Sequence, residues 1–100
     1  MIEFFNRLFG LEDKPDSNEL LKSGATLIDV RTKEEYKQGA AKRSINIPLD
    51  TLNINLSKIK KEKPIIVVCA SGIRSRSAVS LLKSKGFSEV HNGGIWSNYK

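Results

Sequence analysis

The sequence predicts an α/β fold in which helices cover both faces of a mainly parallel β-sheet. Short apolar runs alternate along the chain with amphipathic segments that carry helix start and stop signals. This alternation is typical of a parallel sheet, because parallel strands need a crossover connection, which is usually a helix. The length of 100 residues fits a single domain. We place this domain at residues 16–100 and assign residues 1–15 to an N-terminal amphipathic helix and its connection.

The first elements are marked by apolar spacing and by caps. Residues 2–9 carry apolar side chains at helical spacing and predict the short N-terminal helix. Asp16 and Glu19 have the spacing of a helix start, and Gly24 is suited to end that helix. We therefore expect a second short helix just before the first strand.

The next segments predict a strand, a helix and a strand. Residues 26–30 are a compact apolar run, as in a buried parallel strand. Thr32 and Glu35 have the spacing of a capping box, which predicts a helix through Gln38. Residues 44–48 predict a second short strand that ends at its proline.

The second half of the chain contains the most apolar strand. Residues 49–60 place leucines and an isoleucine on one face and predict a helix. Residues 65–68 are all β-branched, which predicts the central strand. Residues 75–85 predict a long helix that ends at Gly86, with Phe87 folding back in a Schellman motif.

The C-terminal segment predicts three short elements. Residues 89–91 predict a last strand, and residues 92–94 (Asn-Gly-Gly) predict a tight turn. Residues 95–99 predict the start of a final helix, with Trp96 as its packing anchor.

Composition narrows the functional classes. The single cysteine excludes an internal disulfide and a CxxC pair, and with only one histidine we expect no metal site. The net charge of +6 favours anionic partners. The lysines are scattered, however, and the densest run, residues 58–63, has no aromatic side chain for base stacking. We therefore expect no nucleic-acid partner.

Location follows from what the sequence lacks. No apolar run approaches the ~20 residues needed to span a bilayer, so we expect no membrane association. The N-terminus has neither the basic start nor the long apolar stretch of a signal peptide. We expect a cytoplasmic protein; an exported one whose leader had been removed would show the same pattern.

Cys69 is the candidate nucleophile. It follows the most apolar strand and precedes a helix, and ligands of open α/β sheets bind beyond the carboxyl ends of strands. The small residues after it allow a tight loop whose N–H groups face the sulfur, and Arg74 adds a positive charge. These features lower the pKa of a thiol. The alternative is an inert cysteine at the end of a core strand. The following Gly72 and Arg74 favour a reactive cysteine.

Several motifs together resemble the rhodanese family across residues 16–100. The segment Cys-Ala-Ser-Gly-Ile-Arg-Ser resembles the active-site loop of that family, and four further segments match its landmarks in order and spacing. These segments lie at residues 69–75, 28–31, 34–36, 45–49 and 93–96. The resemblance implies a five-stranded, mainly parallel sheet flanked by helices.

The resemblance also implies sulfur transfer through a persulfide on Cys69. The persulfide would be bound by the loop residues Ala70, Ser71, Gly72, Ile73, Arg74 and Ser75. The donor would be thiosulfate or a low-molecular-weight persulfide, and the acceptor would be a thiol or cyanide, including a thiol of a thioredoxin-like or sulfur-relay protein. No metal or organic cofactor is implied.

Three alternatives to a general sulfurtransferase stay open. A relay module would pass sulfur to one protein partner through the same loop, and a non-catalytic binding module would not load sulfur. Related phosphatases and arsenate reductases have one residue more between the cysteine and the arginine. Cys69 to Arg74 counts six residues, which favours the sulfurtransferases.

The remaining residues of the pattern have structural interpretations. Asp29 is a carboxylate at a strand end, and we expect Arg31 to pair with Glu34 or Glu35. The chain departs from the family pattern after Gly39: Ala40 stands at the usual histidine, and Lys42 and Arg43 add two cations. These two cations either change the partner surface or belong to a solvated loop.

Overall fold

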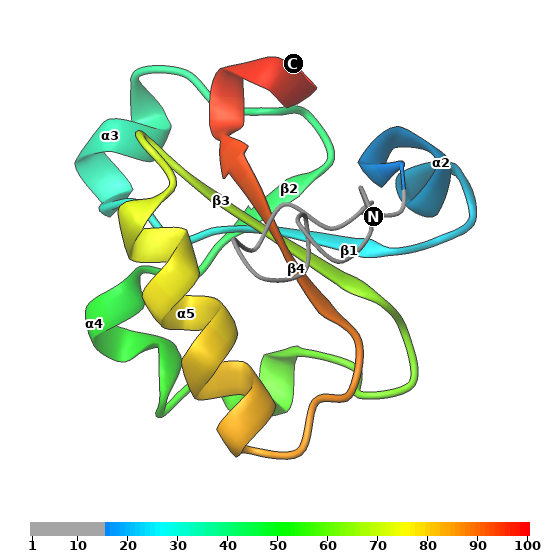
Figure 1. Ribbon diagram of the computed structural model, residues 1–100. Helices are drawn as coiled ribbons and strands as arrows, with labels where there is room; N and C mark the ends of the chain where they lie inside the picture. Colours follow the sequence, from blue (N-terminus) through cyan, green and yellow to red (C-terminus); the bar gives the residue numbers. More distant parts are fainter. Residues whose placement is uncertain (1–15) are drawn as a thin grey trace, which may run out of the picture.

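A computed structural model describes residues 16–100, which form a four-stranded parallel sheet with helices on both faces (Figure 1). The strand order is β2–β1–β3–β4, and all three neighbouring pairs are parallel. The strands are β1 (Thr26–Asp29), β2 (Ser44–Asn46), β3 (Ile65–Cys69) and β4 (Val90–Ile95).

The predicted α/β class is confirmed. The expected count of five strands is wrong for residues 16–100, because only these four segments pair there. The helix predicted at residues 2–9 lies outside the described residues.

The helices and 3-10 helices are α2 (Ser17–Lys22), α3 (Lys33–Lys37), α4 (Leu49–Leu52), the 3-10 helix η1 (Leu56–Lys58), α5 (Ile73–Ser84) and the 3-10 helix η2 (Trp96–Tyr99). The two faces of the sheet are packed by different helices. On one face, Val67 of β3 packs with Leu52 of α4 and Leu82 of α5. On the other, Ile66 packs with Leu20 of α2 and Trp96 of η2. Within residues 16–100, no helix has the length and apolar character to cross a membrane.

Three predicted helix-end signals are confirmed. The Asp16 side chain accepts a hydrogen bond from the Asn18 backbone at the start of α2. Thr32 and Glu35 form the capping box that opens α3. At the end of α5, the N–H of Phe87 donates to the carbonyl of Leu82, as a Schellman motif requires. Short-range signals therefore placed these ends correctly.

The single helix predicted over residues 49–60 is wrong. α4 ends at Leu52, and η1 follows after a turn. The Asn55 side chain donates to the carbonyl of Thr51, which would accept the Asn55 backbone N–H in a continuous helix. That N–H bonds to the carbonyl of Leu52 instead. An asparagine that competes for backbone groups explains the break, while Leu52 and Ile59 still reach the core.

The tight turn predicted at residues 92–94 is also wrong, because these residues belong to β4. The register against β3 shifts between Val67 and Val68, so the strand is irregular there. A Cβ at Gly93 would lie 2.7 Å from the Ile66 side chain. The absence of a side chain at Gly93 therefore lets β4 lie close to side chains of β3 and of the C-terminal 3-10 helix. The final helix predicted from residue 95 is this short 3-10 turn, beginning at Trp96.

Candidate active site

Cys69 is the last residue of β3, at the carboxyl edge of the sheet. Its thiol is free, and the residue has no exposed surface. The loop that follows is short, since α5 begins at Ile73 and not at residue 75 as predicted. The loop residue Gly72 caps α5 with a φ of 99°, a left-handed conformation that glycine adopts without strain. The site therefore combines a buried sulfur with the start of a twelve-residue helix.

The loop directs hydrogen-bond donors at the sulfur. The backbone N–H of Gly72 lies 2.9 Å from Cys69 Sγ, and the N–H of Ser75 lies 3.4 Å from it. The Ser75 hydroxyl is a third neighbour at 3.5 Å. Converging N–H groups at a helix N-terminus form a site for negative charge. This arrangement fits a thiolate or a persulfide anion.

Two opposed effects set the pKa of Cys69. Burial, the largest, raises it. Hydrogen bonds from the Ser75 side chain and from the backbone of Ser75, Gly72 and Ser71 lower it, and together they prevail. The pKa of the thiol is therefore below its ordinary value of 9.0.

Arg74 does not hydrogen-bond to the sulfur; its guanidinium binds Glu35. The two Nη–Oε distances are 2.7 and 3.0 Å, a bidentate pair that joins α5 to α3. The Arg74 hydrogen bonds, together with the Thr32 backbone, hold the pKa of Glu35 at about 2. Both side chains are about one-third exposed. Arg74 thus acts on Cys69 through its charge from a fixed position, with Glu35 partly neutralising it.

The predicted side-chain pairing of Arg31 with Glu34 or Glu35 is wrong. Arg31 binds Asp29 through Nε and Nη2, at 3.0 and 2.8 Å, and both residues are buried. Its guanidinium also donates to the backbone carbonyls of Gly39 and Glu35. The guanidinium lies 4.2 Å from the centre of the Trp96 ring. These contacts support the structural role expected for Asp29 and Arg31.

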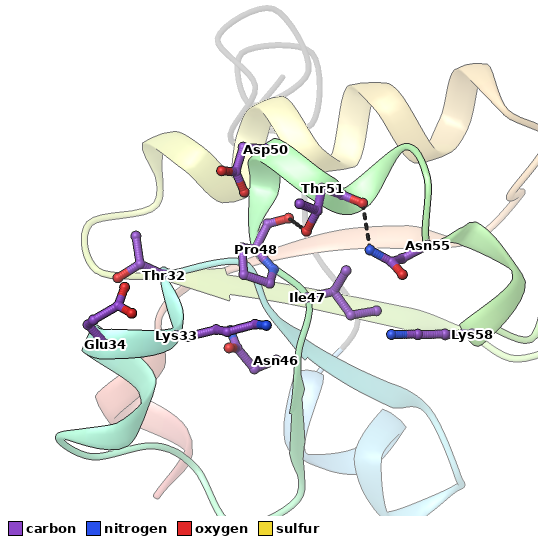
Figure 2. A pocket seen from close by; sticks show the side chains of 10 residues that line it. All are labelled: Thr32, Lys33, Glu34, Asn46, Ile47, Pro48, Asp50, Thr51, Asn55 and Lys58. Atoms are coloured by element: carbon purple, nitrogen blue, oxygen red, sulfur yellow. Dashed lines mark hydrogen bonds between the residues drawn. The ribbon is translucent and has the colours of Figure 1, made fainter.

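A polar cavity of about 410 Å³ lies between α3, β2, α4 and η1 (Figure 2). It is lined by Thr32, Lys33, Glu34, Asn46, Ile47, Pro48, Asp50, Thr51, Asn55 and Lys58. None of these residues belongs to the Cys69–Ser75 loop. Figure 2 shows the Asn55 amide turned back to the Thr51 carbonyl along one wall. The cavity is therefore distinct from the loop that surrounds the Cys69 sulfur.

Comparison with known proteins agrees with this fold. Residues 13–95 match the rhodanese-like domain family. The chain belongs to this family. It is 34% identical over 77 residues to a sulfurtransferase of Allochromatium vinosum, covering 73% of this chain and 72% of the relative. The solved structure of the human single-domain sulfurtransferase TSTD1 superposes with a TM-score of 0.74 at 30% identity, covering 82% of this chain and 87% of TSTD1.

Rhodanese-like domains also occur inside larger proteins. A tRNA uridine(34) hydroxylase of Pelagibacter ubique is 40% identical over 91 residues, which cover 83% of this chain but only 30% of that protein. Family membership therefore establishes a rhodanese-like sulfurtransferase fold and leaves the reaction to be argued from the site.

The sequence located most of the rhodanese loop but missed two of its partners. Ala70 and Ser71 are exposed on the loop, and Ile73 and Arg74 form the first turn of α5. Glu35, one of the two partners that the sequence predicts for the Arg31 side chain, binds Arg74 instead. Asn92, interpreted as a turn residue, lies 2.6 Å from the Ser75 hydroxyl. Only the pairing of β3 with β4 brings it there, so no local signal could have found it.

Lys42 and Arg43, the two cations that depart from the rhodanese pattern, are exposed in the turn before β2.

Proposed function

We propose that this rhodanese is a sulfurtransferase that carries sulfur as a persulfide on Cys69. The observation that supports it most directly is the set of N–H groups of Gly72 and Ser75 around a buried Sγ. Cys69 is the only cysteine, so it is the only residue that can form a persulfide.

The reaction has two displacements on sulfur. The Cys69 thiolate attacks the outer sulfur of thiosulfate, the S–S bond of the donor breaks, and sulfite leaves with the electron pair. An acceptor thiolate or cyanide then attacks the outer sulfur of the persulfide, and Cys69 leaves as a thiolate. Because Cys69 has no exposed surface, the atoms that cover Sγ must move aside for either attack.

Mass spectrometry after incubation with thiosulfate tests this proposal. We expect a gain of one sulfur atom on Cys69, which cyanide removes as thiocyanate. Cys69→Ser should gain none, because a serine oxygen cannot carry a persulfide. Turnover of phosphoesters or arsenate without sulfur loading would contradict the proposal and favour the phosphatase or reductase chemistry.

A protein thiol is the second candidate acceptor, and two exposed isoleucines beside the sulfur favour it. Ile73 is 65% exposed on the first turn of α5, and Ile95, aligned with Cys69 across β3 and β4, is 43% exposed. Exposed apolar side chains next to a reactive group suit contact with a protein surface. The net charge of +6 further favours an acidic partner.

Acceptor competition tests this second candidate. We expect Ile95→Gln to slow transfer to thioredoxin more than transfer to cyanide. Ile54→Gln is the matched control, since Ile54 is 79% exposed in the turn after α4, away from the loop. Equal effects of Ile95→Gln on both acceptors would contradict a protein-docking role.

A further inference from the structure

The Asn92 side chain makes contacts with the active-site loop that its place in β4 does not require. Its Nδ2 donates to the carbonyl of Gly72 at 3.1 Å, and its Oδ1 accepts from the N–H of Gly94 at 2.9 Å. These bonds fix the amide orientation, because a flipped amide would face donor with donor and acceptor with acceptor. The atom of Asn92 that meets the Ser75 hydroxyl is therefore an oxygen, at 2.6 Å.

The Ser75 hydroxyl has one hydrogen and three possible acceptors. Asn92 Oδ1 is at 2.6 Å, the carbonyl oxygen of Gly72 at 3.0 Å and Cys69 Sγ at 3.5 Å. The closest oxygen takes the hydrogen while Cys69 is a thiol, which leaves a Ser75 lone pair facing the sulfur. The thiol can donate its own hydrogen to this lone pair. A thiolate has none to give and needs the Ser75 hydrogen instead.

We propose that Asn92 is a positioning residue that holds the Ser75 hydrogen while Cys69 is a thiol and releases it when Cys69 becomes a thiolate. On ionisation the thiol S–H bond breaks and its proton leaves to solvent. The Ser75 hydroxyl then rotates, and its hydrogen bond to Asn92 is replaced by one to Sγ. Asn92 thereby opposes thiolate formation, which the N–H groups of Gly72 and Ser75 favour. The inference rests on Cys69 being the reactive group of the proposed function.

Other charged groups near Cys69 do not provide this switch. Arg74 of α5 acts on the sulfur by its charge, and Glu35 of α3 is bound to Arg74. The buried Asp29 and Arg31 at the end of β1 bind each other. The hydrogen bonds of the Asn92 side chain within residues 16–100 go to Ser75, Gly72 and Gly94.

Three further ionisable side chains lie on the two elements next to the sulfur. His91 of β4 is aligned with Ile66, three residues before Cys69, and pairs with Glu89. Arg76 and Lys83 of α5 are both exposed. None of the three hydrogen-bonds to the Ser75 hydroxyl, whose partners are Asn92, Gly72 and Cys69.

An NMR titration of the Cys69 ¹³Cβ signal tests the proposal, and the single cysteine makes the signal unambiguous. In Asn92→Ala the Ser75 hydroxyl is free to donate to Sγ, so we expect the pKa of Cys69 to fall and alkylation at neutral pH to become several-fold faster. If Asn92 only braces the loop, its loss loosens the N–H groups and raises the pKa. An unchanged or raised pKa overturns the proposal.

Ser75→Ala provides the matched control. Removing the hydroxyl should raise the pKa of Cys69, and adding Asn92→Ala to this variant should produce no further fall. An equal fall without the hydroxyl overturns the proposal.

A wild-type measurement makes the test independent of how Asn92→Ala folds. The Asn92 side-chain carbonyl signal should shift as Cys69 titrates, and this shift should disappear in Ser75→Ala. If the shift persists in full without the hydroxyl, the proposal fails. These measurements detect ionisation and not sulfur transfer, so they fail independently of the proposed function.

Discussion

Two arginine–carboxylate pairs support the carboxyl edge of the sheet, and they differ in burial rather than in distance. The Asp29–Arg31 pair has an N–O distance of 2.8 Å and side chains that are 0% and 4% exposed. The Glu35–Arg74 pair has a shorter distance, 2.7 Å, but side chains that are 37% and 35% exposed. Distance alone would rank the second pair as the stronger. Burial reverses the order for the cost of losing one partner, because a buried charge left without its partner cannot be solvated by water.

The two pairs therefore have different consequences for the site. Asp29 is the last residue of β1, and Arg31 follows two residues later. Arg31 also donates to the backbone carbonyl of Gly39 and lies over the ring of Trp96. Glu35 and Arg74 link α3 to the first turn of α5, beside Cys69. The Asp29–Arg31 pair should mainly affect the free energy of unfolding, and the Glu35–Arg74 pair should mainly affect the electrostatic field at the sulfur.

The largest expected effect comes from breaking the buried pair. Asp29→Ala leaves Arg31 charged and buried without its partner, which should lower the free energy of unfolding by about 3–5 kcal/mol. Urea denaturation measures this change. The double variant Asp29→Ala/Arg31→Met removes both charges and should lose much less than the sum of the two single variants. Additive losses would mean that the pair is not coupled.

A smaller effect is expected from the cap that orients Glu35. The Thr32 hydroxyl accepts from the N–H of Glu35 and contacts its carboxylate, so Thr32→Ala should cost about 1 kcal/mol. Thr32→Ser keeps the hydroxyl and should recover most of the loss in urea denaturation. A loss in Thr32→Ala as large as that in Asp29→Ala would contradict the ranking by burial.

Removing only the charge of Glu35 should affect stability least and the sulfur most directly. Glu35→Gln keeps the capping geometry but leaves Arg74 without a counter-charge. The field at Cys69 then becomes more positive, so we expect the pKa of the thiol to fall, as measured by the pH dependence of alkylation. A rise would show that holding Arg74 in place matters more than neutralising it.

The sequence predicted those parts of the fold and site that local signals determine. The capping box of Thr32 and Glu35, the Schellman motif at Phe87 and the strand that ends at Cys69 all depend on residues close in sequence. The position of the sulfur at a helix start followed from the same local order.

The sequence did not predict features that depend on contacts between distant segments. The Arg74–Glu35 pair joins residues 39 positions apart. Asn92 and the following glycines have the composition of a turn, but pairing with β3 makes them a strand. The helix break at Asn55 is a different case, because it depends on a local contact. The Asn55 side chain takes the carbonyl of Thr51, four residues earlier, and so ends a helix that apolar spacing alone would continue.

The smallest expected effect is the loss of the exposed pair's contribution to stability at acid pH. The hydrogen bonds of Arg74 and the Thr32 backbone lower the pKa of Glu35 from 4.5 to about 2. A carboxylate with a lowered pKa stabilises the fold above its unfolded value, and this contribution disappears as the pH falls through its folded value. The stability difference between wild type and Glu35→Gln should therefore be constant above about pH 4.5 and shrink toward zero near pH 2, as measured by thermal unfolding at each pH. A difference that does not change down to pH 2 would mean that the charge of Glu35 contributes nothing to the stability of the fold.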